Sequence, residues 1–153
     1  AEGVGLKIEG FDGRLFNMSP SFLEALGVEL ENGELVVPVV KEVPAHAMGS
    51  GYGMTPNVDY DIQTTCSEDV IDELGIKKLR FGDVVALKDQ LNWWGRGYYK
   101  GAVTIGVIIH GWSYHAGHGP GVTTILSAKP GKIVPKIDPD ANIAYYLEIK
   151  ENP

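Results

Sequence analysis

Three of the four histidines, His110, His115 and His118, lie within a nine-residue segment. A neutral imidazole nitrogen is a good ligand for zinc, nickel or iron. The spacing matches no closed structural zinc motif, and the single cysteine, Cys66, is far away in the sequence, so a cysteine-rich structural site is excluded. The cluster predicts either an open catalytic site for a divalent metal such as zinc, or histidines that only hydrogen-bond the surrounding chain.

Two acidic residues, Asp59 and Asp61, form a second candidate group in the segment N-V-D-Y-D-I. In an extended segment their side chains lie on the same side, because side chains alternate with a period of two. Two carboxylates aimed together can ligate a metal or divide acid and base roles between them. The alternative is an aspartate that accepts backbone hydrogen bonds in a turn. Asp83, in F-G-D-V-V-A, is expected to be a turn or sheet-edge residue.

Two glycine clusters, M-G-S-G-Y-G at 48–53 and G-H-G-P-G at 117–121, allow backbone N–H groups to approach a ligand closely. Such groups can form an anion-binding nest or an oxyanion hole, or the glycines can serve only to turn tight corners. Neither cluster fits a P-loop or a dinucleotide fingerprint. The predicted ligand-binding residues are Gly49, Ser50, Gly51, Tyr52, Gly53, Gly117, Gly119, Gly121 and Thr123.

The elements that position these residues are expected to be mainly strands. Twenty glycines in 153 residues are about twice the usual share, which disfavours long helices. Two short helices are predicted: one over 20–26, begun by Ser19-Pro20 and ended by Gly27, and one over 68–74, capped by Ser67 and ended by Gly75. The region 44–64 has no sustained period and is predicted to be a long loop.

Alternating and β-branched runs predict the strands. Residues 5–9 and 14–18 are expected to form a hairpin around Asp12-Gly13, and a second hairpin-like element begins at Asn32-Gly33. Pro38 makes 35–40 an expected edge strand. Further strands are predicted over 78–87, 102–110, 123–127 and 143–149. The expected fold is α+β, mainly β, over a single domain of 1–153: a curled mixed or antiparallel sheet, or a barrel, with two short helices.

Composition excludes several classes of function. A net charge of −7 argues against nucleic acid as a partner, and the longest apolar stretch, 102–109, is too short to span a membrane. The start lacks the features of a signal peptide, which makes a cytoplasmic location the default expectation. The aromatic run Trp93, Trp94, Tyr98 and Tyr99 is expected to pack in the core, wall a pocket or form an oligomer interface.

Five segments carry a resemblance to a known family: M-G-S-G-Y-G, D-Y-D-I-Q, L-R-F-G-D-V-V-A, G-A-V-T-I-G-V-I-I-H and A-G-H-G-P-G-V-T-T. In this order they resemble domain of unknown function 4438, an uncharacterised bacterial and archaeal family. The resemblance implies that the chain is the C-terminal part, or a processed product, of a protein about twice as long. The expected partners are therefore a small-molecule ligand and either a second copy of the chain or an N-terminal portion.

A weaker resemblance connects the chain to the acetamidase and formamidase family. Asp59-Tyr60-Asp61 is similar to that family's acidic loop, Phe81-Gly82-Asp83 to its G-D strand, and Gly119-Pro120-Gly121 to its glycine turn. Val107 stands where the amidase pattern has an acid. We therefore expect a metal-dependent hydrolase acting on a small amide or other C–N bond, or alternatively a non-catalytic small-molecule-binding or structural, oligomer-forming domain.

The hydrolase hypothesis assigns roles to individual residues. The metal would be held by His110, His115, His118, Asp59 and Asp61, and the catalytic residues would be His110, His118 and Asp61. A bound metal would lower the pKa of water and generate the nucleophile. Backbone N–H groups of the two glycine clusters would stabilise the oxyanion.

Overall fold

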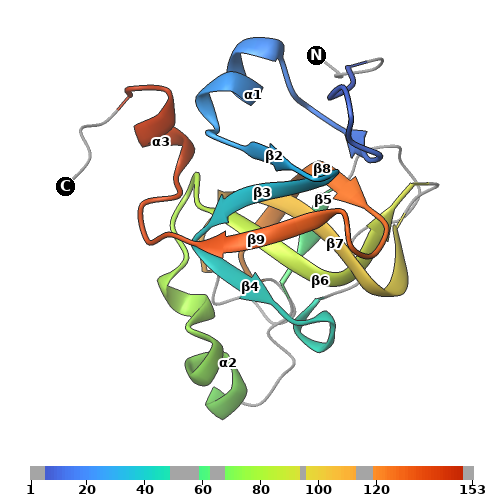
Figure 1. The fold of residues 1–153 in the computed structure, drawn as a ribbon. Helices are drawn as coiled ribbons and strands as arrows, with labels where there is room; N and C mark the ends of the chain where they lie inside the picture. The colour runs from blue at the N-terminus through green and yellow to red at the C-terminus, as the bar shows by residue number, and fades with distance from the viewer. Residues whose placement is uncertain (1–5, 49–58, 63–67, 94–95, 113–118, 150–153) are drawn as a thin grey trace.

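The computed structural model describes residues 6–48, 59–62, 68–93, 96–112 and 119–149, with the backbone alone for 59–61 and 96. Within these ranges most residues lie in strands, and the helices between and after them are short (Figure 1). In chain order the elements are β1 (Arg14–Leu15), α1 (Pro20–Ala25), β2 (Glu29–Glu31), β3 (Glu34–Val39), β4 (Lys41–Val43), η1 (Ala45–Ala47), β5 (Asp59–Asp61), α2 (Glu68–Leu74), η2 (Ile76–Lys78), β6 (Val84–Asn92), β7 (Arg96–His110), β8 (Gly121–Ala128), β9 (Ile133–Ile137) and α3 (Ile143–Tyr146).

The larger sheet has six strands, in the order β1-β8-β7-β6-β4, with β5 also paired to β8. The pairs β6–β7 and β7–β8 are antiparallel, and β4 runs parallel to β6. One edge of β8 is shared by two short strands: β5 pairs with residues 121–123 and β1 with 126–127. This sharing brings a segment from the middle of the chain beside the strand that follows the histidine cluster.

The smaller sheet contains β2, β3 and β9 and lies across the larger one (Figure 1). The main core fills the space between the two sheets. It combines Val37 and Val39 of β3 and Ile133 of β9 with buried residues of the larger sheet, among them Ile105 and Leu126. Burial of such side chains is worth about 1.5–3 kcal/mol each, so this layer holds the sheets together.

A second core covers the opposite face of the larger sheet. Val85 and Leu87 of β6 point to this face, whereas the alternate residues Val84 and Ala86 point into the main core, as the period of two requires. The η1, α2 and η2 segments cover it with Ala47, Ile71 and Ile76, among other apolar residues. Both faces of β6 are therefore buried.

Both predicted helices are confirmed. In α1 the Ser19 hydroxyl accepts a hydrogen bond from the Phe22 N–H at 3.2 Å, and Pro20 occupies the first turn. The α2 helix spans the predicted residues and is followed by Gly75 in the left-handed conformation, with a φ of 65°. Ser67, the predicted cap of α2, lies outside the described residues.

The Asn32-Gly33 hairpin is also confirmed, with positive φ at both residues, as a two-residue β turn of this hand requires. The edge position predicted for residues 35–40 is wrong, because β3 lies between β2 and β9. Pro38 is tolerated there because β2 pairs only with residues 34–36, and the Val39 carbonyl accepts from the Asp138 N–H on the β9 side. Successive residues of a strand point their backbone groups to opposite sides, so those of Pro38 point away from β9. On that side no partner strand needs an N–H from residue 38.

The predicted N-terminal hairpin is wrong in its described part. Residues 6–8 are not a strand, and the chain turns at Glu9-Gly10, where Phe11 N–H bonds the Ile8 carbonyl. Only Arg14–Leu15 is extended, and it pairs with Ser127 and Leu126 of β8. The exposed edge of β8 offers hydrogen bonds that a local hairpin would otherwise supply.

The strand predicted over 143–149 is wrong as well, because residues 143–146 form α3. The Asn142 side chain accepts from the Ala144 N–H at 2.8 Å and starts the helix, while its amide nitrogen donates to Asp83 Oδ1 at 2.9 Å. The strand predicted from residue 78 begins only at Val84, because 76–78 form η2. The β9 strand was not predicted.

The fold class, α+β and mainly β, is confirmed, with two mixed sheets and three α-helices within the described residues rather than two. The barrel alternative is wrong for this part of the chain. The larger sheet has β4 at one edge and β1 and β5 at the other, and these edges do not pair with each other. None of the described helices is long and apolar enough to cross a membrane.

Candidate functional site

Gly121, the first residue of β8, is paired on both of its sides with a predicted site residue. Asp61 of β5 is its register partner on one side, and His110 of β7 is its partner on the other. Adjacent strands lie about 4.8 Å apart, so the Cα atoms of Asp61 and His110 are about 10 Å apart across Gly121. The fold therefore places Asp61, Gly121 and His110 in one row across three strands.

The His110 ring covers Gly121. A Cβ atom on Gly121 would collide with the Nε2 and Cδ2 atoms of this ring. The Nε2 edge of the ring thus lies over β8, the middle strand of the row. Glycine at position 121 is required by this close approach, because any larger residue would displace the imidazole.

Two backbone groups compete for the other ring nitrogen of His110. Nδ1 lies 3.2 Å from the Gly111 carbonyl and 3.3 Å from the Gly121 nitrogen. A protonated Nδ1 donates to the Gly111 carbonyl and leaves Nε2 unprotonated, whereas an unprotonated Nδ1 accepts from the Gly121 N–H and places the proton on Nε2. The tautomer therefore decides whether Nε2 can act as a metal ligand and base or as a hydrogen-bond donor.

A second row lies next to the first. Thr123 of β8, a predicted ligand-binding residue, is in register with Asp59 of β5 and with Val107 of β7. The Asn17 amide nitrogen lies 3.5 Å from the Thr123 hydroxyl and donates to the Thr124 carbonyl at 3.2 Å. Asn17 has a φ of 51° and bonds β8 between the segments paired with β1 and β5. The sequence gives no signal for this contact beyond the tolerance of asparagine for positive φ.

The predicted residues Gly49, Ser50, Gly51, Tyr52, Gly53, His115, Gly117 and His118 lie outside the described residues. Gly119 is described and buried, and the carbonyl of its neighbour Pro120 accepts from the Ile62 N–H at 3.0 Å. Among the described side chains, no three of His, Cys, Asp and Glu group closely enough to hold a metal ion. The roles of the three histidines and two aspartates in metal binding remain predictions.

Asp83 has a structural role and is not part of the row around Gly121. Its carboxylate is 1% exposed and accepts from the Arg80 N–H at 2.7 Å, the Arg80 guanidinium at 3.1 Å and the Asn142 amide at 2.9 Å. The hydrogen bond and charge of Asp83 raise the pKa of Arg80 above its ordinary value. Asp83 is thus the turn residue that its sequence context predicted, and it fastens α3 to the start of β6.

A family comparison covers most of this fold. The model for the domain of unknown function DUF4438, C-terminal, matches residues 25–147, from the end of α1 to the end of α3. The chain belongs to the DUF4438 family. This confirms the resemblance predicted from the glycine-rich segments. The matched range of the DUF4438 domain includes β5, β7 and β8, so the row around Gly121 lies within the family's common region.

The DUF4438 domain is also similar to a solved structure, the crystal structure of TM1086. The two are 41% identical, with a TM-score of 0.82 over 94% of this chain. The match covers 51% of the TM1086 chain, so the DUF4438 domain spans about half of that protein's length. No curated protein matches the chain. Neither match supports the weaker resemblance to the acetamidase and formamidase family.

Proposed function

We propose that this DUF4438 domain is a metal-dependent hydrolase acting on a small amide or other C–N bond, centred on the Asp61–Gly121–His110 row. The observation that carries the proposal is the position of the His110 Nε2 edge over Gly121, with Asp61 in register on the next strand. A carboxylate residue and a histidine on the two strands that flank one glycine suit a divalent cation such as zinc.

The chemistry follows from the tautomer of His110. With Nδ1 donating to the Gly111 carbonyl at 3.2 Å, the ring proton is on Nδ1, and the unprotonated Nε2 is the atom that would coordinate a metal. Metal-binding histidines commonly donate their second ring nitrogen to a backbone carbonyl, which fixes the ring orientation and raises its basicity. A metal held there would lower the pKa of a bound water to about 7 and supply a nucleophile. His115, His118 and Asp59 are the proposed further ligands, and His110, His118 and Asp61 the proposed catalytic residues.

A non-catalytic small-molecule-binding role is the second candidate, and one specific contact favours it. If Nδ1 accepts from the Gly121 N–H at 3.3 Å, Nε2 carries the proton. His110 is then a hydrogen-bond donor to an oxygen of a ligand and cannot coordinate a metal through Nε2.

Zinc binding separates these two roles. Isothermal titration of the apo protein with Zn²⁺ is compared between the wild type, His110→Ala and Asp61→Asn. The hydrolase proposal expects each substitution to weaken zinc binding by at least about tenfold and to abolish zinc-dependent hydrolysis of formamide and acetamide. His46→Ala is the matched control, because His46 lies in η1, outside the row.

Wild-type zinc affinity in both variants would contradict the proposal, and so would turnover that persists in them. Absence of zinc binding in the wild type, together with measurable binding of formamide or acetamide that His110→Ala abolishes, would favour the non-catalytic role. The zinc titration and the amide titration are run on the same preparations, so that misfolding of a variant affects both readouts.

A further inference from the structure

The outer face of the smaller sheet, which points away from the main core, is apolar at its centre. Residues 35–40 read L-V-V-P-V-V, a continuous apolar run of the kind found in strands that are buried on both faces. The structure buries only one of these faces. Val37 and Val39 are fully buried in the main core, whereas Val36 and Pro38 on the other face are only partly buried. Figure 1 shows β3 and β9 in front of the larger sheet, with no helix drawn over them.

The apolar side chains of the outer face adjoin each other. Val36 is in register with Val134 of β9, and the side chains of directly paired residues lie on the same side of a sheet. Val134 is 39% exposed, and neither valine packs into either core. Pro38 lies on the same face, two residues further along β3. Val36, Pro38 and Val134 therefore form an apolar strip that the described part of the chain leaves open to solvent.

Charged side chains of opposite sign lie at opposite corners of this face. Glu29, Glu31 and Glu34 lie on β2 and at the start of β3. Lys136 lies beside Pro38, near the end of β9. All four charged residues are exposed, and none of them makes an ion pair with a charged group whose position the structure describes. An apolar centre with a charged rim is the pattern of a protein–protein interface.

We propose that this face binds the same face of a second copy of the chain, in a two-fold symmetric dimer. Glu31 and Lys136 lie on the two outer strands of the sheet, about 10 Å apart across the strands and about 13 Å apart along them. This separation is too large for an ion pair within one copy. A two-fold axis that passes between them in the plane of the interface brings Glu31 of each copy beside Lys136 of the other. Every contact in such a dimer is made twice.

The distribution of charge favours a second copy over another partner. A partner with a uniformly acidic or uniformly basic surface would match one corner of the face and repel the other. A second copy matches both corners, because its own Glu31 and Lys136 are exchanged by the two-fold axis, and the apolar strips of the two copies meet at the centre. The face consists of three short strands, so we expect a weak dimer with a dissociation constant on the order of micromolar.

This interface is separate from the row around Gly121. The row lies on β5, β7 and β8 of the larger sheet, whereas the interface lies on β2, β3 and β9 of the smaller one. Dimer formation therefore does not depend on the proposed hydrolase function, and failure of one proposal leaves the other intact.

Sedimentation velocity of the purified protein, from about 1 µM to about 500 µM, covers dissociation constants in the micromolar range. Glu31→Lys and Lys136→Glu each place like charges at both contacts of the dimer, and each should weaken dimerisation at least about tenfold. The double variant restores opposite charges and should dimerise like the wild type. An equimolar mixture of the two single variants should also dimerise, because a heterodimer of them has opposite charges at both contacts.

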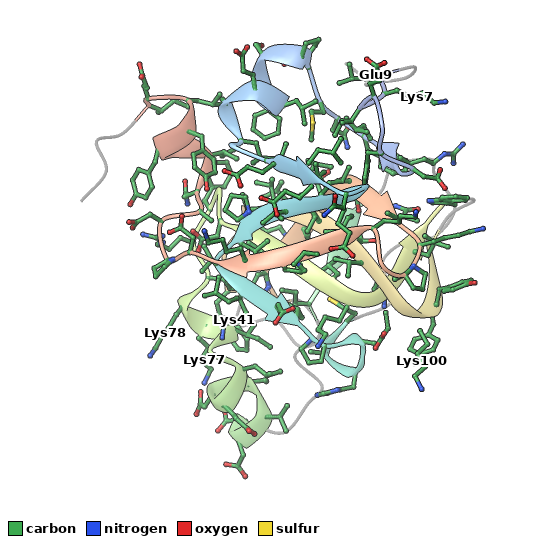
Figure 2. All side chains as sticks on the ribbon, in the orientation of Figure 1. Lys7, Glu9, Lys41, Lys77, Lys78 and Lys100 are labelled. Carbon is green, nitrogen blue, oxygen red and sulfur yellow. The ribbon has the colours of Figure 1, made fainter. Side chains whose placement is uncertain are left out.

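Lys78→Glu is the matched control. Lys78 is exposed on η2 and lies away from the smaller sheet, so the same change of charge should leave dimerisation unaltered (Figure 2). Tyr98→Ser is a second control, because Tyr98, at 68% exposed, is the most exposed tyrosine of β7 and lies in the larger sheet.

A wild-type protein that stays monomeric at the highest concentration would overturn the proposal, and a partner other than a second copy would then cover the face. A mixture of the two single variants that stays monomeric would also overturn it, because only the exchange of Glu31 and Lys136 between copies predicts recovery. So would a dimer that Tyr98→Ser abolishes and Glu31→Lys leaves intact.

Discussion

The imidazole of His110 lies directly over Gly121, in the space that a Cβ atom on Gly121 would fill. Gly121→Ala should therefore displace the ring from the row. Because His110 is exposed and can rotate away, we expect a loss of stability of no more than about 1 kcal/mol but at least about tenfold weaker zinc binding. Urea denaturation and zinc titration measure the two effects. Gly97→Ala is the control, since its Cβ would meet the nearest atom at an ordinary 3.8 Å.

A double-mutant cycle checks this contact independently of zinc. In a His110→Ala background the added methyl group of Gly121→Ala meets no ring, so the stability losses of the two substitutions should not add. Strictly additive losses would show that the ring does not occupy this position in solution.

Asp83 is expected to be the most sensitive single position outside the apolar core. Asp83→Ala leaves the Arg80 N–H and one N–H of the buried Asn142 amide without an acceptor, while the other Asn142 N–H keeps the Phe81 carbonyl; the substitution should cost about 2–3 kcal/mol in unfolding free energy. The Arg80 guanidinium is half exposed and regains water, which keeps the loss below that of a fully buried ion pair. Asp72→Ala, which removes the exposed ion pair with Lys77, should cost under about 1 kcal/mol.

Hydrogen exchange in α3 gives a second readout for Asp83. Because Asn142 both caps α3 and donates to Asp83, we expect hydrogen exchange of the Ala144–Leu147 amides to accelerate in Asp83→Ala before the rest of the domain unfolds. Unchanged protection of these amides would mean that the cap holds without Asp83.

Tyr146 should make the domain less stable in alkali. Burial, with smaller contributions from Asp138 and Asp140, raises the pKa of the Tyr146 phenol to about 12. The phenol of an unfolded chain titrates near pH 10, so the unfolded state loses its proton first. The stability linked to the protonated Tyr146 phenol is fully present below about pH 10, and it is lost as the pH rises from about 10 to about 12.

Tyr146→Phe should remove this part of the alkaline decline, which denaturant titrations between pH 9 and 12 can measure. At neutral pH the variant should be as stable as the wild type, because the Tyr146 hydroxyl is buried without a partner. Tyr98→Phe is the control, since Tyr98 is 68% exposed. An identical alkaline profile in wild type and Tyr146→Phe would refute the assignment.

The buried hydroxyl groups of Ser127 and Thr104 hydrogen-bond each other and the backbone of β6, so their contributions to stability should be strongly coupled. Ser127→Ala leaves the buried Asn92 N–H unpaired and should cost about 1–3 kcal/mol, and Thr104→Val a similar amount. Their double variant should cost less than the sum of the two, because both remove the hydrogen bond between the two hydroxyls. Ser21→Ala, on the exposed surface of α1, should change stability by less than about 0.5 kcal/mol.

Local chemistry in the sequence determined several elements completely. The Asn32-Gly33 turn, the start of α1 at Ser19-Pro20 and the left-handed Gly75 after α2 depend on residues within one turn of each other. Their backbone preferences hold wherever the segment is placed. The histidine and glycine density near residue 110 likewise indicated where the row around Gly121 would lie.

Tertiary contacts decided the rest. The alternating residues 143–149 have the period of a strand, yet Asn142, held by Asp83 from 59 positions away, starts a helix there. A strand's period shows which face is buried but not which strand it pairs with, because backbone hydrogen bonds carry no sequence information. The sequence alone therefore placed His110, Gly121 and Asp61 in two separate segments, and only the shared edge of β8 brought them into one row.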